Sequence, residues 1–271
     1  MDVLAQLAAW SLIAFSFLLF ATQVAAREFG YWLGKRQSAI RGTGDAEGVG
    51  LVVAGMIGLL GFVLALMLSF GSTRFDERRQ GTLDEANAIG TAWLRAEAVG
   101  HPNGTAIAKR LKDYVQVRRD YVQAPRNPET LQQLNQQTSL LQSEIWSDMT
   151  AMVRDRPDPA VVSLMSALNE VFDMGTSERF AHDNRIPQSL FWLLMVLAHI
   201  SMGALGYQLG LKGQRSHIMA SLLTAVWTAV IVVILDLSAP RLGAIRTSVE
   251  VYDWVLEDMN KGVGTHGVGK G

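Results

Sequence analysis

Long apolar runs without any charged side chain dominate the pattern along this chain. Four such runs contain no Asp, Glu, Lys or Arg, and they cover residues 3–26, 48–73, 186–211 and 216–235. A helix needs about 20 residues to cross a hydrocarbon core of about 30 Å, and in lipid its backbone polar groups must be satisfied within the helix. Each run is long enough, so the pattern predicts four transmembrane helices.

The spacing of the runs groups them in pairs, because two short loops and one long segment separate them. We therefore expect an all-α integral membrane protein with two helical hairpins flanking an extramembrane helical bundle. The predicted parts are a first hairpin at 1–73, an extramembrane region at 74–185, a second hairpin at 186–235 and a C-terminal tail at 236–271.

The region between the hairpins shows helical periodicity. Apolar residues recur every three or four positions in three stretches of it, over 107–121, over 130–153 and after Pro159. A fourth stretch, 74–97, has Leu83, Ala86, Gly90 and Trp93 at the same spacing and contains no proline. We expect four helices here, the first of which continues the second span without interruption.

Composition supports a membrane protein and excludes several kinds of chemistry. The chain is 49% hydrophobic and 18% charged, and its formal net charge is -1, so it lacks the basic excess of nucleic-acid-binding proteins. It contains no cysteine, which excludes disulfides and thiolate sites. No phosphate-binding loop, dinucleotide fingerprint or HExxH motif occurs, and the histidines lack ligand spacing. We expect that the protein is not an enzyme and that it has neither a metal site nor a cofactor.

The second run contains regularly spaced glycines, followed by regularly spaced large apolar residues. Glycines in the second and third runs predict close helix packing, since small residues let backbones approach in lipid; they are Gly55, Gly58, Gly61, Gly206 and Gly210. Phe62, Leu66 and Phe70 then follow at four-residue spacing and form a ridge. Such a ridge commonly faces lipid or a core, but around an oligomer axis it would form rings that gate ions by dewetting.

Charged residues of both signs follow the second run. They predict either a solvated helix surface or a collar that lines a vestibule. This collar comprises Arg74, Asp76, Glu77, Arg78, Asp84 and Glu85, with Asn87 beside it.

Three blocks of sequence resemble the bestrophin-like domain family of mainly bacterial membrane proteins. They are LALMLSFGSTRFDERR (64–79), DEANAIGTAWLRAE (84–97) and DLSAPRLGAIRTS (236–248). The family looks distantly related to the bestrophin channels. The resemblance therefore implies a homo-oligomer in a bacterial inner membrane, a pentamer if it follows the bestrophin channels. It also implies that ions pass along the second span, with Phe62, Leu66 and Phe70 at the position of the bestrophin neck.

The third block suggests an anchor for the tail at the base of the spans. Pro240 ends a helix because it cannot donate a backbone hydrogen bond, and Gly243 permits a turn. The expected anchor residues are Asp236, Pro240, Arg241, Gly243 and Arg246, and the two arginines could pair with the acidic residues of the collar.

The expected function is thus an oligomeric ion channel in a lipid bilayer, with its pore along the second span. Two alternatives stay open at this point. One is a membrane sensor or signalling protein whose extramembrane bundle binds a ligand, and the other is a membrane scaffold that does not conduct.

Overall fold

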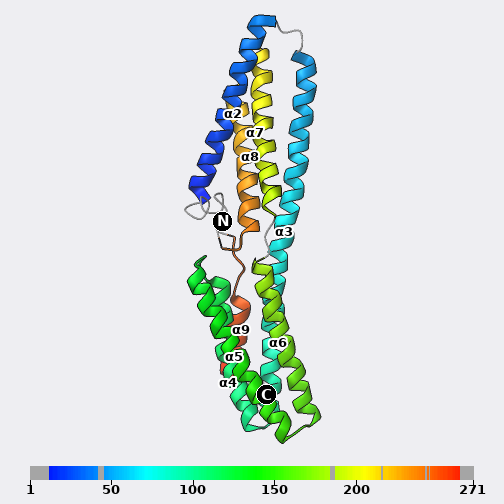
Figure 1. The fold of residues 1–271 in the computed structure, drawn as a ribbon, viewed down its shortest axis with the longest axis vertical. Coiled ribbons are helices and arrows are strands. Elements are labelled where there is room, and N and C mark those ends of the chain that lie inside the picture. The colour runs from blue at the N-terminus through cyan, green and yellow to red at the C-terminus, as the bar shows by residue number, and fades with distance from the viewer. Residues whose placement is uncertain are drawn as a thin grey trace, which may run out of the picture. The chain divides into compact units, whose positions relative to one another are not determined.

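The computed structural model describes residues 12–41, 46–183, 187–214, 216–241, 243 and 245–262, and every regular element in these ranges is a helix. The predicted span residues 3–11 and 186, the loop residue 215 and the tail residues 263–271 lie outside the described residues. The helices shown in Figure 1 are α2 (Leu12–Arg41), α3 (Ala46–Ala98), α4 (Pro102–Gln123), α5 (Pro128–Asp155), α6 (Pro159–Asp183), α7 (Gln188–Leu211), α8 (His217–Ser238) and α9 (Glu250–Lys261).

Four of these helices contain stretches long and apolar enough to cross a membrane: α2, α3, α7 and α8. Helix α2 continues beyond residue 26, where the first uncharged run ends, as far as Arg41. Arg27 and Glu28 are good helix formers and do not stop it. The first dense group of weak helix formers in the sequence is 42–44.

Helix α3 is 53 residues long and runs through the boundary between apolar and charged sequence. The prediction that residues 74–97 continue the second run as one helix is confirmed. Proline is absent from this segment, and its two glycines, Gly81 and Gly90, cost only about 1 kcal/mol each relative to alanine.

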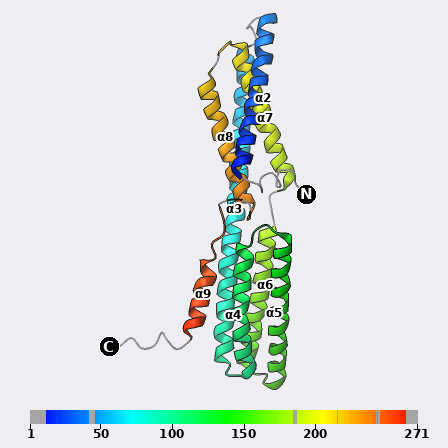
Figure 2. The ribbon, with the colours of Figure 1, turned by 90° about the vertical axis from the view of Figure 1, so that its left-hand side faces the viewer.

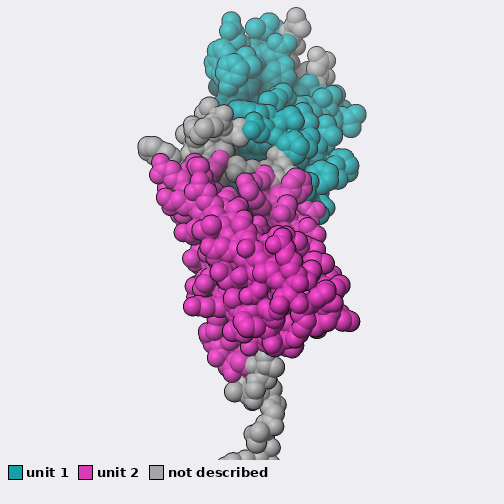
Figure 3. Space-filling model, turned by 60° about the horizontal axis from the view of Figure 1, so that its bottom comes forward, with its two compact units in different colours: residues 1–74, 185–245 teal, residues 75–184, 246–271 magenta. Residues whose placement is uncertain are grey.

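The chain divides into two compact units, coloured separately in Figure 3. Unit 1 comprises residues 1–74 and 185–245, and unit 2 comprises residues 75–184 and 246–271. In unit 1, α2 and α7 lie side by side in both Figure 1 and Figure 2, and α8 also packs on α2. The core of unit 1 is apolar and includes Phe15, Leu19, Leu60, Leu194 and Ile231.

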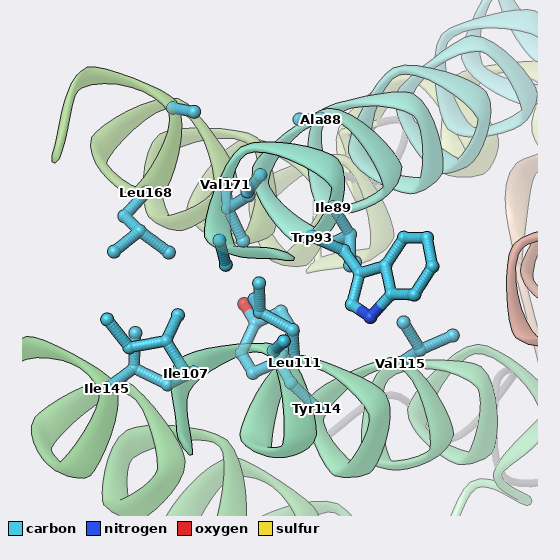
Figure 4. Close-up of a cluster of buried hydrophobic side chains, with 14 of the residues drawn as sticks. Ala88, Ile89, Trp93, Ile107, Leu111, Tyr114, Val115, Ile145, Leu168 and Val171 are labelled. Atoms are coloured by element: carbon cyan, nitrogen blue, oxygen red, sulfur yellow. The ribbon is translucent and has the colours of Figure 1, made fainter. Parts of the chain in front are cut away.

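Unit 2 is a helical bundle with a conventional hydrophobic core. The four helices predicted for 74–185 are confirmed as the second part of α3 and α4, α5 and α6. Figure 4 shows Ile89 and Trp93 of α3 facing Ile107, Leu111 and Val115 of α4. Leu83 shares the helical spacing of Ala86 and Trp93, but its side chain is exposed.

Helix α9 in the tail was not predicted. Its buried residues are Tyr252 and Met259, and the half-buried Val255 and Leu256 pack on the same core. The spacing of these four residues is helical, so the signal was present in the sequence. It covers only 12 residues, which is short for an isolated helix.

Candidate functional site

The predicted pore-facing ridge lies on the side of α3 that points away from the core of unit 1. The side chains of Phe62, Leu66 and Phe70 are 61%, 43% and 51% exposed, whereas those of Leu60 and Leu64 are at most 3% exposed. We call the exposed ridge residues 62, 66 and 70 the α3 ridge. A continuous apolar face of this kind in a membrane helix must be covered by lipid, by another copy or by other ridges around a pore.

The glycines that precede the α3 ridge are open within the chain. A Cβ atom added to Gly55 or Gly58 would meet no other atom within 4 Å, and one added to Gly61 would lie 3.4 Å from the Trp227 ring. Gly55 and Gly58 therefore have no close neighbour among the described residues, contrary to the simplest form of the packing prediction. They leave room for a neighbouring helix from outside it.

Close helix packing occurs instead between α7 and α2. A Cβ atom at Gly206 would collide with the carbonyl of Arg27, and one at Gly210 would collide with the carbonyl of Tyr31. Two glycines of α2 also belong to this contact. Cβ atoms at Gly30 and Gly34 would collide with backbone atoms of α7. Gly30 and Gly34 were not predicted as packing residues, although their four-residue spacing is the usual small-residue signature of membrane helices.

The charged residues that follow the second run divide into two groups. Asp76, Glu77, Asp84 and Asn87 are exposed and Arg74 is half-buried, which suits a solvated collar. Arg78 and Glu85 are only 1% and 0% exposed, so their assignment to an exposed collar is wrong. Both lie on the side of α3 that faces the core of unit 2, alongside Thr82 and Ile89.

Glu85 sits at the centre of a buried polar cluster. It accepts hydrogen bonds from Arg118 on α4, at 2.6 Å to Nε, and from the Tyr252 hydroxyl on α9, at 2.6 Å. Arg118 also donates to the carbonyl of Gly175 on α6 at 3.2 Å and lies over the Tyr121 ring at 4.9 Å. One carboxylate thus connects four helices of unit 2.

The cluster changes the ionisation of its members. Burial, followed by the charge of Glu85, raises the pKa of Tyr252 and the pKa of Tyr114 well above their usual range. Burial by itself would lower the pKa of Arg118, but the Glu85 carboxylate more than offsets that and raises it. The raised pKa values keep the Tyr114 and Tyr252 phenols neutral and the Arg118 guanidinium charged at physiological pH.

A second buried carboxylate, that of Glu178, lies about one helical turn from the cluster around Glu85. Glu178 on α6 accepts a hydrogen bond from Thr82 at 2.7 Å, and His182 approaches its Oε1 at 3.1 Å. A Cβ atom at Gly81 would lie 2.5 Å from Glu178 Oε2, so the glycine makes room for this carboxylate. These contacts stabilise the pairing of α3 with α6.

Two residues of the predicted tail anchor, Asp236 and Gly243, lie against each other. The backbone N–H of Ile245 donates to Asp236 Oδ2 at 3.4 Å, and Gly243 packs so closely on the carboxylate that a Cβ atom there would collide with it. Helix α8 ends at Ser238, two residues before Pro240. Pairing of Arg241 and Arg246 with the acidic collar stays a prediction.

Polar side chains inside the spans of unit 1 also join helices. None of these contacts was predicted. Gln23 is fully buried and donates to Thr228 on α8 at 3.3 Å. Arg27, 5% exposed, donates to Ser221 at 3.1 Å and to Glu28 at 3.0 Å. Polar groups at membrane depth need such partners.

Together these features define an all-helical integral membrane protein with an apolar helix face exposed on α3. The chain belongs to the Bestrophin-like family, because the model of the Bestrophin-like domain matches residues 9–252. The resemblance noted in the three sequence blocks is thereby confirmed.

Solved structures of a bacterial bestrophin homologue from Klebsiella pneumoniae share the fold. One single-residue variant matches with a TM-score of 0.66 at 12% identity, covering 93% of this chain and 97% of that one. Another structure of the homologue matches with a TM-score of 0.65 at 13% identity, covering 93% and 98%. At this identity the likeness concerns the fold. No curated protein matches the chain.

Proposed function

We propose that this protein is an oligomeric ion channel in which α3 lines the pore and the α3 ridge forms its narrowest part. The observation that carries the proposal is the exposure of Phe62, Leu66 and Phe70 on one face of a membrane helix whose opposite face is buried. A ring of these side chains around an axis would exclude water and raise the barrier for a hydrated ion.

The open glycines support the same arrangement. No residue in the described ranges packs on Gly55 or Gly58, so a helix from another copy can approach α3 there. In this proposal, α2 with α3 and α7 with α8 form two transmembrane hairpins. Several copies, five by analogy with the family, then enclose the pore in the inner membrane of a bacterium.

Ion selectivity is left to experiment, because both signs of charge follow the ridge. Arg74 stands nearest to it on α3, and the exposed Asp76 and Glu77 follow within one turn. With Arg78 buried, residues 74–79 still present the carboxylates of Asp76 and Glu77 and the guanidiniums of Arg74 and Arg79. Chloride and potassium gradients must therefore both be tested.

The experiment compares ion flux through vesicles that contain purified protein. Replacing Phe62, Leu66 and Phe70 together by alanine should increase flux, because shorter side chains admit water to the constriction. A matched control replaces Leu222, Val226 and Val233 by alanine. These α8 residues are also apolar and exposed, and they share one helix face, but the proposal places them away from the pore.

Equal flux changes in both triple variants would contradict a neck at the α3 ridge. Protein that carries neither anions nor cations, as wild type or as the ridge variant, would contradict the channel itself. In that case the sensor or the scaffold would be the better description.

A further inference from the structure

The end of α2 carries an exposed aromatic and basic cluster that the channel proposal does not use. Phe29 and Trp32 are 62% and 54% exposed, and their rings stack with centroids 6.1 Å apart. The guanidinium of Arg36 lies over the Trp32 ring at 5.7 Å, and Lys35 is exposed beside it. We call Trp32, Lys35 and Arg36 the α2 basic cluster.

Helix register within unit 1 places this cluster at one edge of the hydrocarbon. A Cβ atom at Gly50 of α3 would lie 2.8 Å from Gln208 Nε2, and one at Gly206 would lie 3.0 Å from the backbone N of Tyr31. Gly206 and Gln208 are only half a turn apart on α7. The beginning of the uncharged run in α3 and the Tyr31–Trp32 step of α2 are therefore at nearly the same depth.

The opposite edge can be located in the same way. A Cβ atom at Gly71 would lie 3.3 Å from Leu237 Cβ, close to the end of α8 and three residues before Arg74. Gly50 and Gly71 are 21 residues apart, which is about 32 Å of helix. That length matches a hydrocarbon core of about 30 Å, so Trp32 lies at an interface and Lys35 and Arg36 lie one turn outside it.

Within the described part of the chain, Lys35 and Arg36 form no ion pair. Among the residues that the structure describes, no carboxylate comes within ion-pair distance of Lys35 or Arg36. Both follow Trp32 by three or four residues, so they share its side of the helix. Unpaired cations just outside the hydrocarbon face the phosphate layer of the leaflet.

We propose that the α2 basic cluster binds the headgroup of an anionic phospholipid. The guanidinium of Arg36, held over the indole of Trp32, presents a planar pair of donors to a phosphate, and the Lys35 ammonium adds a second charge. Phe29 lies one turn deeper and contacts the acyl chains. This lipid site is independent of whether the protein conducts ions.

Native mass spectrometry of the detergent-solubilised oligomer tests the site by counting bound phosphatidylglycerol and phosphatidylcholine during titration. Wild type should prefer phosphatidylglycerol, and the preference should fall as salt is raised. Lys35→Gln with Arg36→Gln should weaken phosphatidylglycerol binding roughly 30-fold, since each basic residue near an anionic surface contributes about a factor of five. Binding of phosphatidylcholine should not change.

The control variant, Lys109→Gln with Lys112→Gln, removes the same charge from α4 in unit 2 and should leave lipid binding unchanged. Equal binding of both lipids, or equal loss in the two double variants, would overturn the proposal. Competition by inorganic phosphate at the same concentration would show a general anion site, and a changed subunit number would show a contact between copies. Either result would also overturn it.

Discussion

Glu85 and Arg118 form a two-point ion pair inside unit 2, with distances of 2.6 Å from Nε to Oε1 and 3.2 Å from Nη2 to Oε2. Their side chains are 0% and 1% exposed, so water cannot replace either partner. The pair joins α3 to α4, and the hydrogen bond from Tyr252 to Glu85 brings α9 into the same cluster.

Removing one partner of this pair should destabilise the protein strongly. Arg118→Met leaves the Glu85 carboxylate buried without its cation, and breaking a buried pair in this way costs on the order of 3–5 kcal/mol. The neighbouring variant Arg119→Met breaks a pair with Asp253 whose partners are 36% and 45% exposed, and it should cost at most about 1 kcal/mol. Thermal unfolding of the full chain in detergent measures both.

The double variant Glu85→Met with Arg118→Met measures the interaction energy between the two side chains, apart from the effect of each single substitution. It removes both charges together, so its loss should be smaller than the sum of the two single losses. Strict additivity would mean that the two side chains do not act as a pair.

Alkaline pH should unfold unit 2 through its buried phenols. The pKa of Tyr252 and the pKa of Tyr114 are raised above the ordinary value of 10.0 by burial and then by the charge of Glu85. A raised folded-state pKa means that the stabilisation is complete below pH 10 and is lost as the pH rises above it. Ultraviolet titration should show these two phenols ionising only when the helices unfold.

Variants with phenylalanine at positions 114 and 252 provide the comparison for that titration. They lack the two hydroxyls, so their unfolding midpoint should depend less on pH above 10 than that of wild type. Phenolate absorbance from Tyr114 or Tyr252 in the still-folded protein near pH 10 would contradict the buried cluster.

The contact between α2 and α7 should be sensitive to a single methyl group. Gly206→Ala places a Cβ atom against the Arg27 backbone, which cannot move without shifting the helix, and should cost about 1–3 kcal/mol. Gly48→Ala is the matched control because a Cβ atom there meets nothing within 4 Å. Equal unfolding temperatures for the two variants in detergent would show that the helices are less tightly packed.

Periodicity was sufficient to predict the helices, while partners in space decided which side chains are buried. Uncharged runs and three- or four-residue spacing predicted the spans, the continuous α3 and the bundle. The same logic counted Arg78 and Glu85 among exposed charges. The burial of Glu85 depends on Arg118, Gly175 and Tyr252, which lie far away in the sequence.

The α2–α7 contact was predicted only in part, on its α7 side. Gly206 and Gly210 were recognised as packing residues, but their partners Gly30 and Gly34 lie beyond the expected end of the first span. The charges at Arg27 and Glu28 suggested that the membrane helix stopped there. Arg27 is instead buried through its bonds to Ser221 and Glu28.

The most direct test of a pore along α3 uses the absence of cysteine from the chain. Leu66→Cys introduces the only thiol, and a charged, membrane-impermeant methanethiosulfonate reagent can reach it only through water. The control Val226→Cys places a thiol on the exposed apolar face of α8. A pore at the α3 ridge predicts that the reagent changes the current of the Leu66→Cys channel and leaves the current of the Val226→Cys channel unchanged. An unmodified thiol at position 66 in a conducting protein would contradict it.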